Sequence, residues 1–417
     1  MVLREDEEAM LEGKDGPGLE RCLKLLIKYG DALGAESLVN VASTHVFNGF
    51  PLELLMELSE GARQSKTATT LHPFMSLADP MACEELGISK EVCSSHKREQ
   101  LGRERIYKRL GFLETYTCTP HLVGNLPKKG DYVSWFGSGL QVLVNSVIGA
   151  RQNRDGAVVN MAIALTGKAP LHGLYLEENR YGEILVKIGG LDSSQLRSID
   201  YGAIGYYVGG IAGERNVVID GLNRTMSLDE IKYLLTPMST SGSVSICHIV
   251  GVTPEEPDLK TALGNKAPKE TVHIGKEEVR KTLETYSNRA YETVDLVMLG
   301  CPHCSTQELK KIAALLRDKR VGNNQRLWIG TAHQTYDLAE TMGCSQVIDE
   351  AGGTFARVCM AALPDCPLPS DVKVVATNSF KIAHYVSVIS RGRVNVLIGD
   401  VEECIGAAVS GRWEGGE

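Results

Sequence analysis

The sequence predicts an α/β protein with more than one domain, and three observations support that prediction. The chain has 417 residues, enough for two or three domains that each bury a hydrophobic core. After Tyr291, short runs of β-branched or aliphatic residues alternate with helical segments, a pattern typical of βαβ units in a parallel sheet. Two capping boxes, Ser227–Glu230 and Ser305–Glu308, each precede an apolar helical pattern and therefore mark helix starts.

The first half of the chain predicts a mixture of helices and short strands. Up to about Gly61, helical patterns flank one short strand at Ser37–Ser43. The polar stretch at 94–110 predicts a helix with a solvated face. The segment at 116–257 alternates short strands and helices, and its glycines crowd one stretch, which suggests tight turns rather than a phosphate loop. These glycines are Gly202, Gly205, Gly209, Gly210 and Gly213.

The second half predicts a linker followed by a regular βαβ region. Residues from Glu255 to about Gly275 are rich in Pro, Lys and Glu, which favours a linker or an exposed excursion. We therefore divide the chain into an N-terminal and middle region, 1–285, and a C-terminal region, 286–417. Four strands are expected in the C-terminal region, at Val294–Leu299, Arg326–Gly330, Val372–Ala376 and Val394–Ile398. Ligands of parallel sheets gather at the carboxyl ends of such strands.

Composition and charge exclude several classes of function. The formal net charge of −8 and the absence of basic stretches interleaved with aromatics give no support for a nucleic-acid partner. The acidic start has no apolar core of a secretory signal, and no apolar run is long enough to span a bilayer. We therefore expect a cytoplasmic protein. Disulfides are rare in the cytoplasm, so a subset of the eleven cysteines is a candidate for metal binding or catalysis.

The pair in Cys301-Pro-His-Cys304 follows an expected strand and precedes the helix capped by Ser305. At a helix N-terminus, free N–H groups and the helix dipole favour thiolate. The motif alone is compatible with a redox pair, half of a zinc site or cluster ligands. The absence of a second C-x-x-C in the sequence weakens structural zinc.

Two further cysteines extend the pattern. Cys118 lies in Thr117-Cys-Thr-Pro-His121, and Cys359, in Ala356-Arg-Val-Cys-Met360, is expected at the end of a strand. Together with Cys301 they can supply three thiolates from three loops. A [4Fe–4S] cluster normally has four cysteine ligands, so three leave one iron open to bind a substrate carboxylate and hydroxyl. That iron acts as a Lewis acid while a base takes the neighbouring C–H proton, which is the chemistry of a dehydratase.

Longer motifs run in order along nearly the whole chain. They are Thr69–Pro73, Tyr116–Pro120 with Gly124-Asn125, Asn145-Ser146 with Gly149–Arg154, Ser241–Ser245 with His248–Pro254, Leu299–Ser305, Thr377–Ser379 with Lys381 and Ala383–Tyr385, and Glu402–Arg412. As a set, the motifs resemble the aconitase X family, whose members include the large subunit of phosphomevalonate dehydratase and the cis-3-hydroxy-L-proline dehydratases.

The resemblance implies a three-domain aconitase-like α/β fold with parallel or mixed sheets flanked by helices. It implies a hydro-lyase that acts on a small anionic hydroxy acid, with mevalonate 5-phosphate and cis-3-hydroxy-L-proline as candidate substrates. It also implies an iron–sulfur cluster on Cys118, Cys301 and Cys359, with Cys304 in reserve. A [4Fe–4S] cluster is favoured, and [2Fe–2S] and [3Fe–4S] forms stay open. The swivelling domain is expected on a separate small subunit, which would supply the catalytic base.

Several polar residues are candidates for substrate binding. They are Ser43, His45, Thr70, Arg151, Asn153, Arg154, Ser379 and Lys381. Each has an alternative role. The arginines suit a carboxylate or phosphate, and equally suit ion pairs at a surface turn. His45 fits a hydrogen-bonded structural histidine, and the Thr377–Ser379 segment fits both an anion site and an ordinary helix cap.

Three positions depart from the family pattern. Gly137 stands where relatives usually have an acidic residue, Arg357 precedes the third cysteine in place of the usual Asp-Thr, and His333 lies in a segment that is more often arginine-bearing. These changes favour a more anionic substrate. They also leave open a catalytically altered or inactive iron–sulfur subunit with a binding or redox role. A thiol redox protein built on Cys301 and Cys304 is a third class of function.

Overall fold

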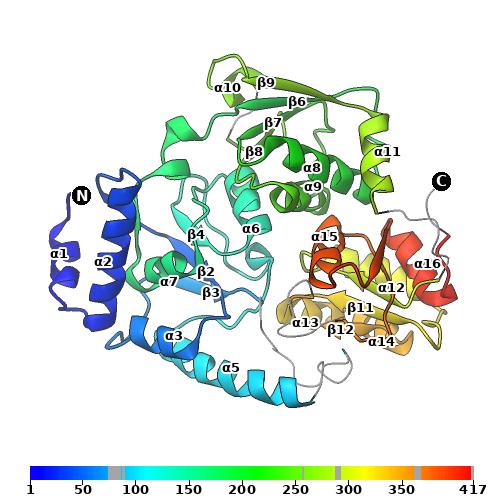
Figure 1. Ribbon diagram of the computed structural model, residues 1–417, viewed down its shortest axis with the longest axis horizontal. Helices are drawn as coiled ribbons and strands as arrows, with labels where there is room; N and C mark the ends of the chain where they lie inside the picture. Colours follow the sequence, from blue (N-terminus) through cyan, green and yellow to red (C-terminus); the bar gives the residue numbers. More distant parts are fainter. Residues whose placement is uncertain (74–85, 87–89, 256–257, 287–292, 361–367, 415–417) are drawn as a thin grey trace.

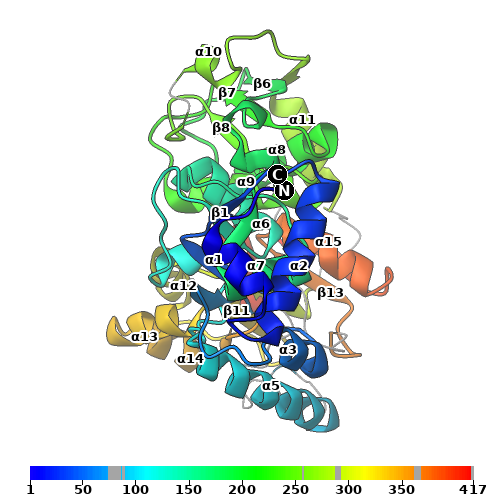
Figure 2. The same ribbon diagram turned by 90° about the vertical axis from the view of Figure 1, so that its left-hand side faces the viewer.

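The computed structural model describes residues 1–73, 86, 90–255, 258–286, 293–360 and 368–414. Figure 1 shows three α/β units, each built around its own sheet, and so confirms the predicted fold class. In Figure 2 the pair of N-terminal helices lies in front, and the second unit is stacked above the first. The predicted division at residues 285 and 286 stays a prediction. Among the described residues, no helix combines the length and apolar character needed to cross a membrane.

The first unit centres on a three-stranded parallel sheet with the order β3-β2-β4. Its main elements are α1 (Glu5–Leu11), α2 (Pro17–Ala32), β1 (Leu38–Asn40), β2 (Ser43–Val46), α3 (Leu52–Leu58), β3 (Ala68–Leu71), α5 (Lys90–Leu110), β4 (Val133–Trp135), α6 (Ser138–Leu143), α7 (Ala157–Thr166) and β5 (Lys168–Pro170). The polar helix predicted at 94–110 is confirmed as α5. The single strand predicted at Ser37–Ser43 is wrong: the chain leaves β1, which pairs with β5, before it enters the separate sheet at β2.

The second unit is a four-stranded parallel sheet with the order β8-β7-β6-β9. Its elements are β6 (Ile184–Ile188), α8 (Ser198–Ala212), β7 (Val217–Asp220), α9 (Leu228–Ser241), β8 (Cys247–Ile249), α10 (Leu259–Ala262), β9 (Glu270–Ile274) and α11 (Lys276–Glu284). The stretch at 255–275, predicted as a linker or an exposed excursion, is not a linker in its described part, because β9 pairs with β6 along its full length. Most of its described residues are partly or fully exposed, as the second alternative predicted. Residues 256–257 of that linker lie outside the described residues.

The glycine-rich stretch is a helix rather than the predicted series of turns. Gly202, Gly205 and Gly209 all lie within α8. A Cβ at Gly205 would stand 1.9 Å from the carbonyl oxygen of Leu234, and one at Gly209 would stand 2.3 Å from that of Met238. Both carbonyls belong to α9, so the glycines let the two helix backbones approach closely. Hydrophobic packing has therefore overridden the low helix propensity of glycine.

The third unit is a five-stranded parallel sheet with the order β12-β11-β10-β13-β14. Its elements are β10 (Leu296–Leu299), α12 (Thr306–Leu316), β11 (Arg326–Gly330), α13 (His333–Thr341), α14 (Cys344–Glu350), β12 (Thr354–Ala356), β13 (Val374–Thr377), α15 (Phe380–Ile389), β14 (Asn395–Ile398) and α16 (Val401–Ser410). All four predicted strands are found. The chain order changes direction between β10 and β13, which is where ligands of such sheets bind.

Candidate active site

Two of the cysteine-bearing loops leave one edge of the third sheet. Cys301 comes two residues after β10, and Cys359 follows β12 by three residues. Cys118 comes from the first unit, and its Sγ accepts a hydrogen bond of 3.0 Å from the backbone N–H of His303. The fold therefore brings a thiol of the first unit onto the cysteine loop of the third. All three of these cysteines are partly exposed, whereas Cys304 is buried.

The thiols are electrostatic neighbours. Burial raises the pKa of Cys118, and the neighbouring thiols of Cys301 and Cys359 raise it further. Burial also raises the pKa of Cys301, while the positive charges of Lys381 and Lys232 act to lower it. Soft sulfur donors beside cations suit an anionic iron–sulfur cluster, so the donor set fits the predicted group. Among the described residues, no three His, Cys, Asp or Glu side chains converge tightly enough to hold a single metal ion.

Ser379 and Lys381 lie beside these thiols at the change of strand direction. Ser379 caps α15, and its hydroxyl donates a 2.6 Å hydrogen bond to the carbonyl oxygen of Cys301. The Nζ of Lys381 donates to the hydroxyl of Ser138, at the start of α6, over 3.3 Å. This contact brings a third-unit cation against the first unit. The structure thus assembles both residues at the predicted site.

Ser43, His45 and Thr70 are engaged within the first sheet instead. The Ser43 hydroxyl accepts a hydrogen bond from the indole of Trp135, at 3.2 Å. His45 Nδ1 and Thr70 Oγ1 are 2.8 Å apart, and the amide of Asn125 donates to the same Thr70 oxygen at 2.7 Å. All three are buried, and burial lowers the pKa of His45 to about 3, so this histidine is neutral. Their contacts match the structural role that the sequence left open for His45.

The three candidate residues of the Arg151–Arg154 motif, Arg151, Asn153 and Arg154, divide into two groups. Arg151 donates to the carbonyl oxygen of Tyr175 at 2.9 Å and pairs with Glu177. Asn153 bonds the backbone and ring of His172 and accepts from the N–H of Leu174, so it fixes the same loop. Arg154 is exposed, and no hydrogen bond or ion pair joins it to the rest of the described chain. It remains the member of the motif available to a substrate.

Gly137 lies between β4 and α6, directly before the first residue of that helix. It adopts a φ of +112°, and a Cβ there would stand 3.0 Å from Nε2 of His72. His72 follows β3, and burial together with Lys381 and the nearby His45 and His303 holds its pKa well below the usual value. The sequence did not single out His72, although it stands one residue past a strand, within the quoted Thr69–Pro73 motif. It joins the site as a neutral imidazole opposite the position where the family usually has an acid.

The other two departures from the family pattern are in contact with each other. Nη1 of Arg357 lies 3.1 Å from Nδ1 of His333. The guanidinium carbon of Arg357 also lies 4.9 Å from the ring centre of Tyr336, a cation–π contact. These residues follow β12 and β11 at the same sheet edge as Cys301. The two unusual side chains therefore form one basic and aromatic group at the predicted site.

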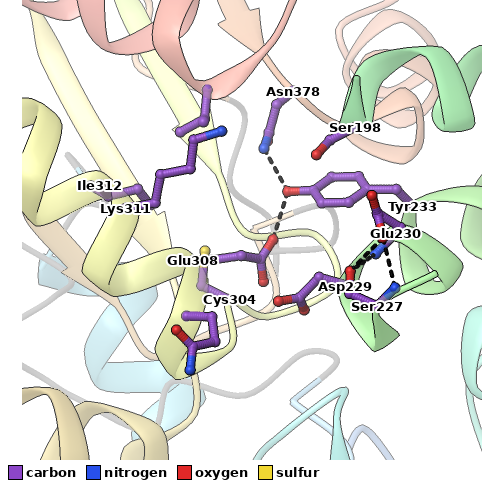
Figure 3. A pocket seen from close by; sticks show the side chains of 12 residues that line it. Ser198, Ser227, Asp229, Glu230, Tyr233, Cys304, Glu308, Lys311, Ile312 and Asn378 are labelled. Carbon is purple, nitrogen blue, oxygen red and sulfur yellow. Dashed lines mark hydrogen bonds between the residues drawn. The ribbon is translucent and has the colours of Figure 1, made fainter. Parts of the chain in front are cut away.

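Cys304 faces a different part of the molecule. It lines a cavity of about 220 Å³ between α9 and α12, together with Asp229, Tyr233, Glu308 and Asn378. Figure 3 shows these side chains gathered around that cavity. The other three candidate cysteines do not line it. Cys304 thus lines this cavity, and its thiol is also an electrostatic neighbour of Cys118.

Comparison with known proteins gives matches along nearly the whole chain. Three family models match in order: the aconitase X first domain over residues 1–178, the second domain over 182–284 and the third domain over 294–410. The chain is also similar to the crystal structure of Thermococcus kodakaraensis aconitase X in its holo-form. The TM-score is 0.84 at 29% identity, over 98% of this chain and 100% of the other. The predicted three-domain aconitase-like fold is confirmed.

Two curated relatives indicate the class of enzyme. The phosphomevalonate dehydratase large subunit of Methanocaldococcus jannaschii is 33% identical over 97% of this chain and 99% of its own length. The cis-3-hydroxy-L-proline dehydratase of Pseudomonas aeruginosa is 29% identical over 98% of this chain and 70% of its own length. Both relatives are dehydratases, which confirms the predicted enzyme class, a hydro-lyase.

Proposed function

The chain belongs to the aconitase X family, and we propose that it is the iron–sulfur-bearing large subunit of a dehydratase for a small anionic hydroxy acid. The observation that carries the proposal is the grouping of Cys118, Cys301 and Cys359 from three loops of two units. A cluster held by three cysteines supplies a Lewis acid at its open iron. We favour a [4Fe–4S] cluster at this site.

The chain's own residues bind and orient the substrate. Lys381 presents a cation beside Cys301 and Ser138, and Arg154 presents a guanidinium without a partner among the described residues. An arginine fork suits a carboxylate or phosphate group, and a lysine suits either as a point charge. His72 and His303 are neutral because burial lowers their pKa, to about 4 for His303. The Nε2–H of His303 donates to the carbonyl oxygen of Val358 at 3.1 Å, so its Nδ1 can accept a hydrogen bond from a substrate hydroxyl without adding charge.

The catalytic base and the swivelling domain belong, in this proposal, to a separate small subunit. The support is that several relatives are named as large subunits and match this chain over almost their full length. Mevalonate 5-phosphate and cis-3-hydroxy-L-proline are the candidate substrates, since the relatives' names specify these two. The basic group formed by Arg357 and His333 favours the more anionic of the two, mevalonate 5-phosphate.

The proposal is tested by anaerobic purification with iron and sulfide analysis and an absorption spectrum. We expect iron and sulfide in equal, stoichiometric amounts, and dehydration of one of the two substrates once a small subunit is added. Activity without the second subunit would overturn the two-chain assignment. A protein that binds no iron, even after reconstitution, would overturn the dehydratase mechanism and favour a redox or scaffold role. A loaded but inactive complex would favour the catalytically altered subunit, for which Gly137 is the specific observation.

Two neighbouring arginines separate substrate binding from structure. Arg154→Gln is expected to lower kcat/KM by about 10- to 150-fold, because a hydrogen bond to a charged group contributes about 1.5–3 kcal/mol. Arg151→Gln should leave kcat/KM unchanged and lower stability by at most about 1 kcal/mol, since its ion pair is partly exposed. Steady-state kinetics and thermal unfolding of both variants check this. Equal kinetic effects of the two substitutions would remove Arg154 from the substrate site.

A further inference from the structure

We propose that Lys232, on α9 of the second unit, is a positioning residue that clamps the cysteine loop of the third unit for cluster binding. The inference rests on the proposed function. Lys232 is 4% exposed, and its Nζ reaches the carbonyl oxygen of His303 at 3.5 Å. It also pairs with Glu308, the residue that closes the capping box at the start of α12. The lysine therefore touches the Cys301–Glu308 segment at two points, His303 and Glu308.

Three residues of α9 share this contact. Asp229, Lys232 and Tyr233 stand at positions i, i+3 and i+4, so they face the same side of the helix. Asp229 accepts a 2.7 Å hydrogen bond from the hydroxyl of Ser305 and pairs with Lys232 at 3.2 Å. Tyr233 donates a 2.6 Å hydrogen bond to Glu308. One helix face thus holds the loop that carries Cys301 at three points.

The same face reaches the second loop of the site. The amide of Asn378 donates a 2.7 Å hydrogen bond to the Tyr233 hydroxyl, and Figure 3 shows Asn378, Tyr233 and Glu308 in one continuous chain of hydrogen bonds. Asn378 precedes Ser379, whose hydroxyl binds the carbonyl oxygen of Cys301. The clamp therefore joins the loops after β10 and β13, the two strands between which the sheet changes direction.

Charge and space make this clamp sensitive to one substitution. Removing the ammonium leaves Glu308 and Asp229 without their shared cation in a site that is largely buried, which is strongly unfavourable. The cavity of about 220 Å³ beside Tyr233, Glu308 and Asn378 gives the loosened loop room to move. Lys232 also places a positive charge near Cys301, where it stabilises bound thiolates or an anionic cluster. Loss of the lysine should therefore affect both the loop and the cluster.

The experiment compares Lys232→Met and Lys232→Arg with a matched control, Lys168→Met. Lys168 is equally buried and pairs with Asp6 and Glu7, but it lies in β5 of the first unit. In the metal-free full-length chain, hydrogen exchange at 301–305 and 377–379 should be at least about tenfold faster in Lys232→Met, because breaking a buried pair is costly. Lys168→Met should leave both segments unchanged, and Lys232→Arg should restore most of the protection.

In the reconstituted protein, Lys232→Met should release iron to a chelator several-fold faster and shift the cluster's reduction potential to a more negative value. Lys232→Arg keeps the positive charge and should leave the potential unchanged, so the comparison of the two variants reports the lost charge. If hydrogen exchange at 301–305 and 377–379 is equally fast in Lys232→Met and Lys168→Met, the proposal that Lys232 holds the cysteine loop is wrong. If Lys232→Met does not fold, Tyr233→Phe removes a single contact and should still speed exchange at both segments. If the wild type binds no iron, the proposed function is wrong. The hydrogen-exchange rates would still show whether Lys232 holds the cysteine loop.

Discussion

Serine substitution at Cys118, Cys301 or Cys359 is expected to remove the bound iron and all measurable dehydratase activity. Serine keeps the size of the side chain but replaces the soft thiolate with a hydroxyl that binds iron–sulfur clusters poorly. The three positions come from different loops, and two of those loops meet where the His303 N–H binds Cys118 Sγ. A cluster shared by three loops loses its geometry when any one ligand is lost, so we expect equal effects.

Iron and sulfide analysis of anaerobically reconstituted variants measures this directly. Cys344→Ser is the control, because Cys344 is a buried cysteine of the same unit at the start of α14, where serine fits a helix N-terminus. Cys304→Ser decides the role of the reserve ligand: retained iron would confirm that its thiol, which faces the α9–α12 cavity, is not needed. If Cys359→Ser keeps its full iron content and Cys304→Ser loses iron, then Cys304 is the third ligand and Cys359 is not.

The third unit could be predicted well from the sequence because its signals are local. Its four predicted strands are short apolar runs, and Ser305 with Glu308 forms the capping box that the spacing indicated. Because neighbouring strands of a parallel sheet end on the same side, the sequence alone places Cys301 and Ser379 close together at the carboxyl ends of two strands. The sequence placed the end of a strand at Cys359, whereas β12 ends at Ala356, because a run of only three residues gives no periodic pattern that fixes its bounds.

The rest could not be predicted because it depends on contacts between distant segments. Arg151 and Arg154 look alike in sequence, yet only Arg151 meets the loop that carries Tyr175 and Glu177. The glycines of α8 favoured turns in the sequence. The structure has a helix there, which is explained by the close packing of these glycines against α9. Lys232 gave no signal at all, since its role arises from Glu308, which is 76 residues away. Tertiary contacts of this kind routinely override local propensity.

The second large effect is expected at Lys381. Its Nζ reaches the hydroxyl of Ser138 and meets no carboxylate among the described residues, so its charge is not balanced by the protein there. A half-buried cation of this kind is suited to an anionic ligand, either the substrate or the cluster. Lys381→Met should lower kcat/KM by about 10- to 150-fold, the equivalent of about 1.5–3 kcal/mol for one charge-assisted hydrogen bond.

The control for Lys381 is Lys373→Met. Lys373 is exposed in the same unit, and its Nζ donates to the carbonyl oxygen of Ser370 at 3.3 Å, so its substitution should leave kcat/KM unchanged. The iron content of Lys381→Met shows whether the anionic partner of Lys381 is the substrate or the cluster. If Lys381→Met keeps its iron but loses kcat/KM, the lysine binds substrate; if it loses both, the charge is needed to hold the cluster. Unchanged kinetics with unchanged iron would remove Lys381 from the site and leave Arg154 as its principal cation.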